Sequence, residues 1–208
     1  MSSLGALAGH PLVPVIVIDD PARALGLADA LLAGGIHCAE ITLRTPRALD
    51  AIRAMSAVPD FTVGVGTVLT EEQLDQAIDS GSKFAVSPGL NERLVRTCIN
   101  RGVGVLPGIA TASEAMAALA LGLEAVKFFP ADRLGGLGTI RALAAALPGL
   151  GFIPSGGVSE ATVTEYLADP AVPAVSGAWM APAALISDGD FAEITRRASV
   201  AVALAGAR

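Results

Sequence analysis

The chain has 208 residues, a length that one globular domain can fill, and we treat residues 1–208 as a single domain. Hydrophobic residues make up 52% of the sequence and aromatic residues only 4%, so the core is expected to consist mainly of Ala, Val, Leu and Ile. The formal net charge is −6 and the sequence has no cluster of Lys or Arg. This argues against binding through a phosphate backbone, and nucleic acid is not an expected partner.

The N-terminal apolar run and the cysteines indicate a cytoplasmic protein. The run at residues 12–18 ends at two aspartates and is too short for a secretory or membrane-spanning segment, so no membrane partner is expected. Cys38 and Cys98 fit neither a disulfide framework nor a zinc-ligand spacing. Because His10 and His37 are the only histidines, we expect no metal site and no cofactor, and we assign these four residues no role.

Short runs rich in Val, Ile and Phe alternate with helix-like stretches about eight times along the chain. The expected strands cover residues 12–18, 38–44, 62–68, 84–88, 104–110, 125–130, 151–157 and 172–179. Helical stretches rich in Ala and Leu lie between them, such as 21–35 and 70–81, and several stop at a glycine. The last segment, residues 198–208, is expected to be an amphipathic packing helix.

The repeated order of strand and helix predicts an α/β protein with a single (β/α)8 barrel, the TIM barrel. Buried parallel strands appear as continuous apolar runs and need helical crossovers, and the connections here are short. A doubly wound open sheet is the alternative fold. That fold would usually carry G-x-G-x-x-G after its first strand, whereas the first strand here leads into DDPARAL.

Ionisable residues interrupt two of the expected strands near their carboxyl ends, which is the active-site face of such a barrel. Lys127 should lie on the same side of its strand as Phe129, with Val126 and Phe128 facing the helices. Removing water from an amine disfavours its charged form, so a buried lysine can attack a ketone and form a Schiff base. Glu40, the only glutamate within an expected strand, can move the proton. A buried ion pair without a catalytic role is the simpler alternative.

Neighbouring strand ends add candidates for substrate binding. Arg44 follows Glu40 by four residues, and its planar guanidinium suits a substrate carboxylate, although a surface role is almost as plausible. Thr67 can hydrogen-bond a substrate oxygen and Pro88 can form a wall, but both are common turn residues. Gly66 is expected to have only a structural role.

Two loops of small residues, PSGGVSEATV and VSGAWM, follow the seventh and eighth expected strands. Each places bare backbone N–H groups before the start of a helix, and loops at these two positions usually bind phosphate in this fold. The candidate residues are Ser155, Gly156, Gly157, Ser176, Gly177 and Ala178. Tight turn geometry alone is the alternative interpretation.

Seven motifs occur in a fixed order across nearly the whole chain: VPVIVI, EITLRT, GVGTVL, AVSPGL, LPGIAT, VKFFPA and PSGGV. Together they resemble the bacterial 2-keto-3-deoxy-6-phosphogluconate (KDPG) aldolases, which also act on 4-hydroxy-2-oxoglutarate. The resemblance implies a class I, metal-independent carbon–carbon lyase on a TIM barrel that acts on a small 2-keto acid. It further implies a place in carbohydrate metabolism, in the Entner–Doudoroff pathway, and usually a homotrimer.

The resemblance also assigns roles to individual residues. Lys127 matches the Schiff-base lysine of the family, Glu40 its general acid and base, and Arg44 its carboxylate-binding arginine. The other matches are Thr67, Pro88 and Phe129 as substrate-binding residues, and Gly156 and Gly157 as phosphate-binding residues.

The sequence departs from the family pattern at two places. The family commonly has TGG where residues 155–157 are SGG, a change that keeps the hydroxyl. The family sequence GGSW is SGAW at residues 176–179, so Ala178 replaces a phosphate-binding serine. One lost hydrogen bond to a charged phosphate is worth about 1.5–3 kcal/mol, which raises the Michaelis constant roughly tenfold or more. Ser176 is not expected to compensate, because its hydroxyl should point elsewhere.

The sequence therefore predicts cleavage of KDPG to pyruvate and D-glyceraldehyde 3-phosphate, and of 4-hydroxy-2-oxoglutarate to pyruvate and glyoxylate. Ala178 favours an alternative, the same chemistry on an unphosphorylated or epimeric 2-keto-3-deoxy sugar acid. A metal-dependent aldolase is disfavoured, because the sequence lacks a cluster of carboxylates and histidines. A non-catalytic sugar-acid-binding barrel stays open as a different class, although such a protein would not need an amine facing a base.

Overall fold

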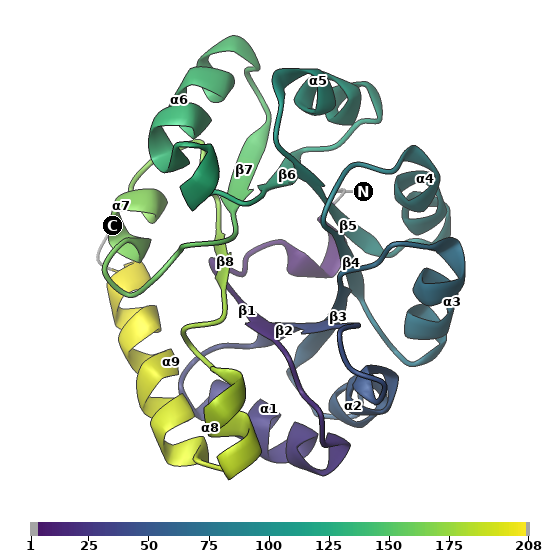
Figure 1. Cartoon of the computed structure of the whole chain (residues 1–208), viewed down its shortest axis with the longest axis vertical. Coiled ribbons are helices and arrows are strands. Elements are labelled where there is room, and N and C mark those ends of the chain that lie inside the picture. Colours follow the sequence, from purple (N-terminus) through teal and green to yellow (C-terminus); the bar gives the residue numbers. More distant parts are fainter. Residues whose placement is uncertain (1–3, 207–208) are drawn as a thin grey trace.

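Eight parallel strands form a barrel at the centre of the structure, a computed structural model that describes residues 4–206 (Figure 1). The strands are β1 (Leu12–Ile16), β2 (Cys38–Thr42), β3 (Thr62–Gly66), β4 (Phe84–Ser87), β5 (Gly104–Ile109), β6 (Ala125–Phe128), β7 (Gly151–Pro154) and β8 (Val175–Gly177). They lie side by side in the order β7-β6-β5-β4-β3-β2-β1-β8. A bridge between Ser155 and Ser176 joins the ends of β7 and β8 and closes the barrel. The predicted TIM barrel is confirmed, and the doubly wound open sheet is wrong.

Every strand ends earlier than the sequence predicted. The residues beyond each strand leave the ladder of hydrogen bonds and form the loops at the carboxyl end of the barrel. The eighth strand also begins later than residue 172, at Val175, because Pro173 has no N–H to donate to a neighbouring strand. These loops carry most of the predicted site residues, namely Arg44, Thr67, Pro88, Phe129, Ser155, Gly156, Gly157 and Ala178.

Helices surround the barrel on the outside (Figure 1). They are α1 (Ala24–Ala33), α2 (Ala48–Met55), α3 (Glu71–Asp79), α4 (Glu92–Arg101), α5 (Ala112–Ala120), α6 (Gly136–Ala146), α7 (Val163–Leu167), α8 (Ala183–Asp188) and α9 (Phe191–Gly206). Short 3₁₀ turns are η1 (Gly5–Leu7), η2 (Pro21–Arg23) and η3 (Asp132–Leu134). The predicted helical stretch at 70–81 begins with a capping box, in which Thr70 and Gln73 each bond the other's backbone N–H. Gly102 ends α4 in the left-handed conformation, with φ of 67°.

The apolar core has two parts, and strand alternation decides which residues enter each. Val126 and Phe128 of β6 are fully buried in the outer part, between the strands and the helices, as the sequence predicted. Ala125 belongs to the inner part, inside the barrel. Leu7 of η1 joins this inner cluster and closes the amino end of the barrel. Lys127 is the next inward position after Ala125, so it lies nearer the carboxyl end of the interior.

The last helix, α9, packs along α1. Its buried residues Ile194, Ala198, Ala201 and Ala205 form one face, which confirms the predicted amphipathic helix as far as residue 206. The expected domain boundaries at residues 1 and 208, and the end of that helix, lie outside the described residues. Between residues 4 and 206, none of the helices combines the length and hydropathy required to cross a bilayer.

Candidate active site

Lys127 of β6 and Glu40 of β2 face each other inside the barrel. The Lys127 Nζ lies 3.6 Å from the Glu40 Oε1, and the two side chains are 8% and 1% exposed. Both strands present these residues inward because they occupy alternate positions with outward-facing apolar residues. The prediction that an amine and a carboxylate meet in the barrel is therefore confirmed, while their catalytic roles stay predictions.

The Glu40 carboxylate has unused hydrogen-bonding capacity. Neither of its oxygens has a hydrogen-bond partner among residues 4–206, and the distance to Lys127 is too long for a good hydrogen bond. A buried carboxylate without hydrogen bonds destabilises the fold, because it has lost its water without replacement. Such a group is typical of a site in which the substrate supplies the missing partner.

Gly66, the last residue of β3, leaves the space that the Glu40 carboxylate occupies. A Cβ at this position would overlap the Oε1 of Glu40. The two strands are paired so that Gly66 lies next to Thr42, two residues beyond Glu40. This steric role agrees with the structural role predicted for Gly66, but the contact with Glu40 was not predicted, because the register of β2 against β3 is not visible in the sequence.

Phe129 follows β6 and covers the Lys127 amine. The Nζ of Lys127 lies 5.3 Å from the centre of the Phe129 ring, within the range of a cation–π contact. Because the ring is only half-buried, one of its faces remains available to the cavity beside it. Phe129 thus lies next to both the amine and the cavity, and its role as a wall that keeps water from Lys127 stays a prediction.

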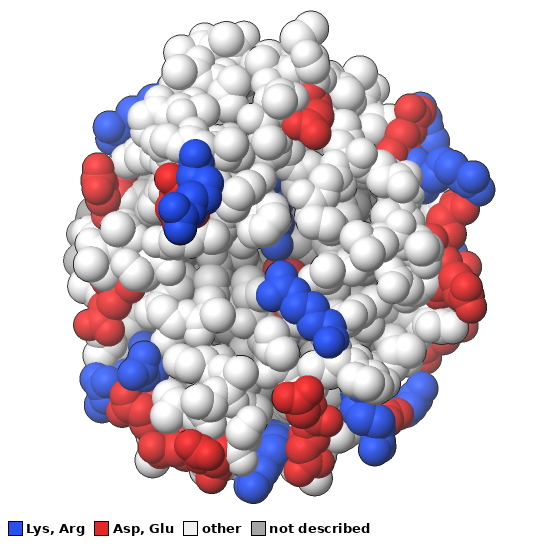
Figure 2. All heavy atoms as spheres, in the orientation of Figure 1, with Lys and Arg blue, Asp and Glu red and all other residues white. Residues whose placement is uncertain are grey.

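A cavity of about 310 Å³ opens at the carboxyl end of the barrel, next to Phe129; neither Lys127 nor Glu40 lines it. Its walls bring together the loops after β2, β6, β7 and β8, and they contain the residues Val15, Arg44, Phe129, Ser155, Gly156, Gly157, Val158, Gly177, Ala178 and Trp179. Figure 2 shows charged atoms near the centre of one face of the molecule, surrounded by uncharged residues, whereas most other charges lie near the rim. Six of the predicted binding residues besides Phe129 thus share one cavity, namely Arg44, Ser155, Gly156, Gly157, Gly177 and Ala178.

Arg44 is the basic residue of this cavity. Its side chain is exposed, and it makes no hydrogen bond or ion pair with any described residue. Most other arginines of residues 4–206 are paired with a carboxylate, for example Arg141 with Asp169 at 2.7 Å. The guanidinium of Arg44 is therefore available for an anion, and its planar donors suit a carboxylate.

The loop after β7 is built for close approach of a ligand to the backbone. Gly156 and Gly157 have φ of 90° and 77°, in the left-handed region that favours glycine. Both glycines line the cavity, and without side chains they leave their backbone accessible to a ligand there. The loop after β8 is equally tight, because a Cβ on Gly177 would overlap the ring of Trp179.

The hydroxyl of Ser176 does not reach this cavity. Ser176 is fully buried, and its Oγ donates a hydrogen bond to the Oγ of Ser155 at 3.2 Å. Ser176 is also absent from the cavity walls, which agrees with the expectation that its hydroxyl points elsewhere. Ala178 contributes a methyl group to the wall, where a serine would offer a hydroxyl.

Thr67 and Pro88 lie at the same end of the barrel but do not line this cavity. Thr67 directly follows β3 and has a φ of 61°, which is strained for a β-branched residue. Its hydroxyl makes no hydrogen bond with a described residue. Pro88 directly follows β4, is exposed, and packs its carbonyl against Gly108. Substrate-binding roles for these two residues stay predictions.

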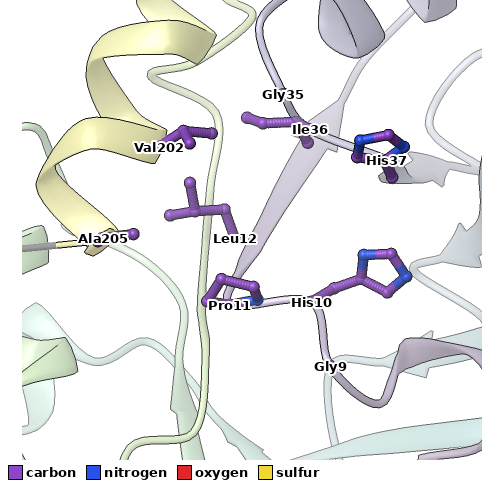
Figure 3. Close-up of a pocket in the computed structure, with 10 residues that line it drawn as sticks. Gly9, His10, Pro11, Leu12, Gly35, Ile36, His37, Val202 and Ala205 are labelled. Carbon is purple, nitrogen blue, oxygen red and sulfur yellow. The ribbon is translucent and has the colours of Figure 1, made fainter.

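A larger cavity, of about 560 Å³, lies at the opposite end of the barrel (Figure 3). It is formed by the segments that enter β1 and β2 and by the end of α9, and the rings of His10 and His37 form one side of it. Burial, and next the nearby His37, lower the pKa of His10 below its ordinary value. The residues that line this cavity all differ from those that line the cavity next to Phe129. Its greater volume therefore does not identify it as the reaction centre.

The two cysteines are unreactive because they are buried. Burial raises the pKa of both the Cys38 and the Cys98 thiols to about 12, so neither is a thiolate near neutral pH. Among residues 4–206, no group of three or more His, Cys, Asp or Glu side chains is arranged to hold a metal ion. The buried amine at Lys127 is thus the nucleophile that the described site offers.

Comparisons with known proteins find relatives along nearly the whole chain. The family model of the KDPG and KHG aldolases matches residues 5–197. The 2-dehydro-3-deoxy-phosphogluconate aldolase of Treponema pallidum is 45% identical to this chain, and the match covers 88% of each protein. The KHG/KDPG aldolase of Escherichia coli K12 is 42% identical, and the match covers 97% of this chain and 95% of that protein.

A crystal structure of the Legionella pneumophila KDPG aldolase, with pyruvate captured as a covalent carbinolamine, superposes with a TM-score of 0.91 at 37% identity, over 97% of this chain and 98% of its own. A crystal structure of the Zymomonas mobilis enzyme with 3-phosphoglycerate has a TM-score of 0.88 at 43% identity, over 94% and 92%. The chain therefore belongs to the family of KDPG and KHG aldolases.

Proposed function

We propose that this protein is a class I, metal-independent aldolase that cleaves KDPG to pyruvate and D-glyceraldehyde 3-phosphate. We propose 4-hydroxy-2-oxoglutarate, cleaved to pyruvate and glyoxylate, as a second substrate. The observation that carries the proposal is the buried Lys127 amine, 3.6 Å from a Glu40 carboxylate that lacks hydrogen bonds within residues 4–206. The covalent pyruvate adduct in the Legionella relative supports the same chemistry here.

In the proposed reaction the neutral amine of Lys127 attacks the C2 ketone of the substrate and forms a carbinolamine. Glu40, having taken a proton from the Lys127 ammonium, donates that proton to the departing hydroxyl. The carbinolamine thereby loses water and leaves a protonated imine between Lys127 and C2. Glu40, again ionised, then takes the proton of the C4 hydroxyl. The C3–C4 bond breaks, the aldehyde leaves, and the bonding electrons pass into the imine to form an enamine. Glu40 returns the proton to C3, and hydrolysis of the imine releases pyruvate and restores the amine.

The rest of the cavity would hold the two ends of the substrate. Arg44, with Thr67, would bind the carboxylate next to the reacting ketone, and Phe129 and Pro88 would keep water away from Lys127. The glycine loops after β7 and β8, with Ser155, Gly156, Gly157, Gly177 and Ala178 in the cavity wall, would bind the phosphate at the far end. Ser176, the other predicted member, is buried away from the cavity and is not proposed to take part. The 3-phosphoglycerate in the Zymomonas structure supports a site for a small phosphorylated acid in this family.

Ala178 favours a second candidate substrate class, the unphosphorylated or epimeric 2-keto-3-deoxy sugar acids. A methyl group replaces a hydroxyl at the cavity wall, and the hydroxyl of Ser176 is engaged by Ser155 instead. Cleavage rates on phosphorylated and unphosphorylated substrates separate the two candidates. A preference for the phosphorylated substrate above about a hundredfold contradicts the second one.

We further propose that the enzyme acts as a homotrimer in the cytoplasm, in the Entner–Doudoroff pathway. Two buried free thiols, Cys38 and Cys98, support a reducing compartment. A relative of similar fold, which is 28% identical, forms part of a cage designed by fusing symmetric oligomeric domains, and this supports assembly. Sedimentation of the purified protein tests the trimer.

Borohydride reduction in the presence of pyruvate tests the catalytic proposal. Mass spectrometry should find one reduced adduct per chain, on the peptide that contains Lys127. The exposed Lys83 precedes β4 at the amino end of the barrel, so it serves as the internal control and should stay unmodified. Binding of pyruvate without any adduct would instead favour the non-catalytic sugar-acid-binding barrel.

A further inference from the structure

The segment that carries Arg44 is fastened to both neighbouring strands. Thr42, the last residue of β2, donates its hydroxyl to the carbonyl of Ile16 at 2.7 Å, at the end of β1. Thr45 donates its hydroxyl to the carbonyl of Ile18 at 2.6 Å. Leu43 donates its backbone N–H to the carbonyl of Gly66 at 2.9 Å, at the end of β3. Hydrogen bonds from three of four successive residues thus hold the backbone on each side of Arg44.

The side chain of Arg44 contrasts with this backbone. It is exposed and makes no hydrogen bond or ion pair with a described residue, although it lines the cavity. Nothing within residues 4–206 therefore orients the guanidinium directly. Its position in the cavity depends on where the backbone places the start of a long, flexible side chain.

Neither threonine is explained by secondary structure alone. Thr42 is fully buried, and valine has the same shape and an equally high preference for strands. Thr45 follows the strand in a turn, where a hydroxyl is also not required by the backbone conformation. What both hydroxyls share is a carbonyl of the segment that leaves β1, at residues 16 and 18. Together they tie the turn around Arg44 to a single neighbouring segment.

We propose that Thr42 and Thr45 are positioning residues that place Arg44 for the carboxylate of the 2-keto acid. The inference rests on the proposed function, in which Arg44 binds that carboxylate. Without the hydroxyls the turn moves more freely, and the guanidinium samples positions away from the substrate. Lys127 itself lies on β6, apart from this turn, so formation of its adduct should persist. Glu40 lies two residues before Thr42 on β2, whereas Thr45 lies beyond the strand, so Thr45→Val is the variant that tests positioning with least disturbance of Glu40.

The test uses the full chain with Thr42→Val, Thr45→Val and Arg44→Ala, singly and combined. The measurement is the pyruvate concentration that gives half-maximal borohydride trapping at Lys127, together with KM and kcat for cleavage. Each threonine variant should raise the half-maximal concentration and KM about three- to tenfold and leave kcat within about twofold. In the Arg44→Ala background the same threonine variants should have no further effect.

Matched variants separate positioning from general loss of structure. Thr42→Ser and Thr45→Ser keep the hydroxyl and should restore the unaltered values. Thr195→Val removes a hydroxyl that bonds the carbonyls of Ala30 and Phe191 on the outer helices, so it should change thermal stability but not KM. If buried Thr42→Val does not fold, the half-exposed Thr45→Val carries the comparison alone.

Two results would overturn the inference while leaving the catalytic proposal intact. One is an unchanged pyruvate dependence in the threonine variants with normal trapping at Lys127. The other is that the threonine variants raise the half-maximal pyruvate concentration by the same factor whether residue 44 is arginine or alanine. Absence of any adduct in the unaltered protein would instead contradict the proposed function. In that case the affinity for pyruvate, measured by calorimetry in the same set of variants, tests whether the threonines position Arg44.

Discussion

The Cα of Gly66 and the carboxylate of Glu40 share a space that holds no additional carbon atom, because a Cβ on Gly66 would overlap the Glu40 Oε1. The two residues belong to adjacent strands, β3 and β2. Glu40 is buried, and a displacement of its carboxylate would change the 3.6 Å distance to Lys127. The glycine is therefore part of the reason that the carboxylate faces the amine.

Gly66→Ala should displace the Glu40 side chain and lower kcat by at least about a hundredfold, the scale of a lost general acid–base group. The added methyl group should also lower the free energy of unfolding by about 1–3 kcal/mol, because it overpacks the interior of the barrel. Steady-state kinetics and chemical denaturation measure the two effects.

Gly138→Ala is the matched control for this substitution. Gly138 lies in α6, and a Cβ there would meet nothing within 4 Å. This variant should keep full activity and gain about 0.5–1 kcal/mol of stability, because alanine favours a helix. Wild-type kcat in Gly66→Ala would contradict the crowding of Glu40.

Glu40→Gln should lower kcat by about 10²- to 10⁴-fold, since glutamine keeps the shape of the side chain and cannot transfer the proton. Lys127 should still be trapped by borohydride with pyruvate, only more slowly, because the amine remains. Steady-state cleavage assays measure kcat, and time-resolved mass spectrometry measures the rate at which the Lys127 adduct forms. Complete loss of the adduct would mean that Glu40 is needed to keep the amine reactive rather than to move protons.

The sequence predicts the inward position of Lys127 and Glu40 because both interrupt apolar strands, and inward residues of a closed barrel must converge. The strand ends are less predictable. Apart from Lys127 the run at 125–130 is apolar, yet β6 stops at Phe128, where the chain turns to form the cavity wall. Apolar residues outside the ladder are needed to cover the lysine, so composition does not distinguish them from strand residues.

Contacts between distant strands could not be predicted at all. The hydrogen bond from Ser176 to Ser155 depends on β7 and β8 meeting at the point where the barrel closes. The role of Gly66 depends on the register of β3 against β2. Both are properties of the pairing of strands, whereas periodicity reports only on one strand at a time.

Folding stability should fall as the pH drops below about 6.5, in part because of His10. Burial and the nearby His37 lower the pKa of His10 from its ordinary value of 6.5. Below pH 6.5 the unfolded chain therefore takes up a proton on His10 before the folded chain does, which favours unfolding until the pH also falls below the folded pKa. Denaturation curves at pH 7 and at lower pH should show a smaller loss for His10→Gln than for the unaltered protein.

His37→Gln is the companion variant for this pH effect. It removes the smaller cause of the lowered pKa at His10, the electrostatic effect of the neighbouring ring, and leaves the burial. The loss of stability at low pH should become smaller but should not disappear. An identical pH dependence in the unaltered protein and in His10→Gln would show that His10 does not contribute.

Ala178→Ser should strengthen binding of a phosphorylated substrate. The methyl group of Ala178 forms part of the cavity wall next to the glycine loops, and a serine there can donate one hydrogen bond to a phosphate oxygen. A hydrogen bond to a charged group is worth about 1.5–3 kcal/mol, so KM for KDPG should fall about tenfold or more. KM for 4-hydroxy-2-oxoglutarate should stay unchanged, because this substrate has no phosphate.

Ala117→Ser, on the exposed face of α5, is the control and should alter neither value. Equal effects of Ala178→Ser on both substrates would mean that the loop after β8 does not bind the phosphate.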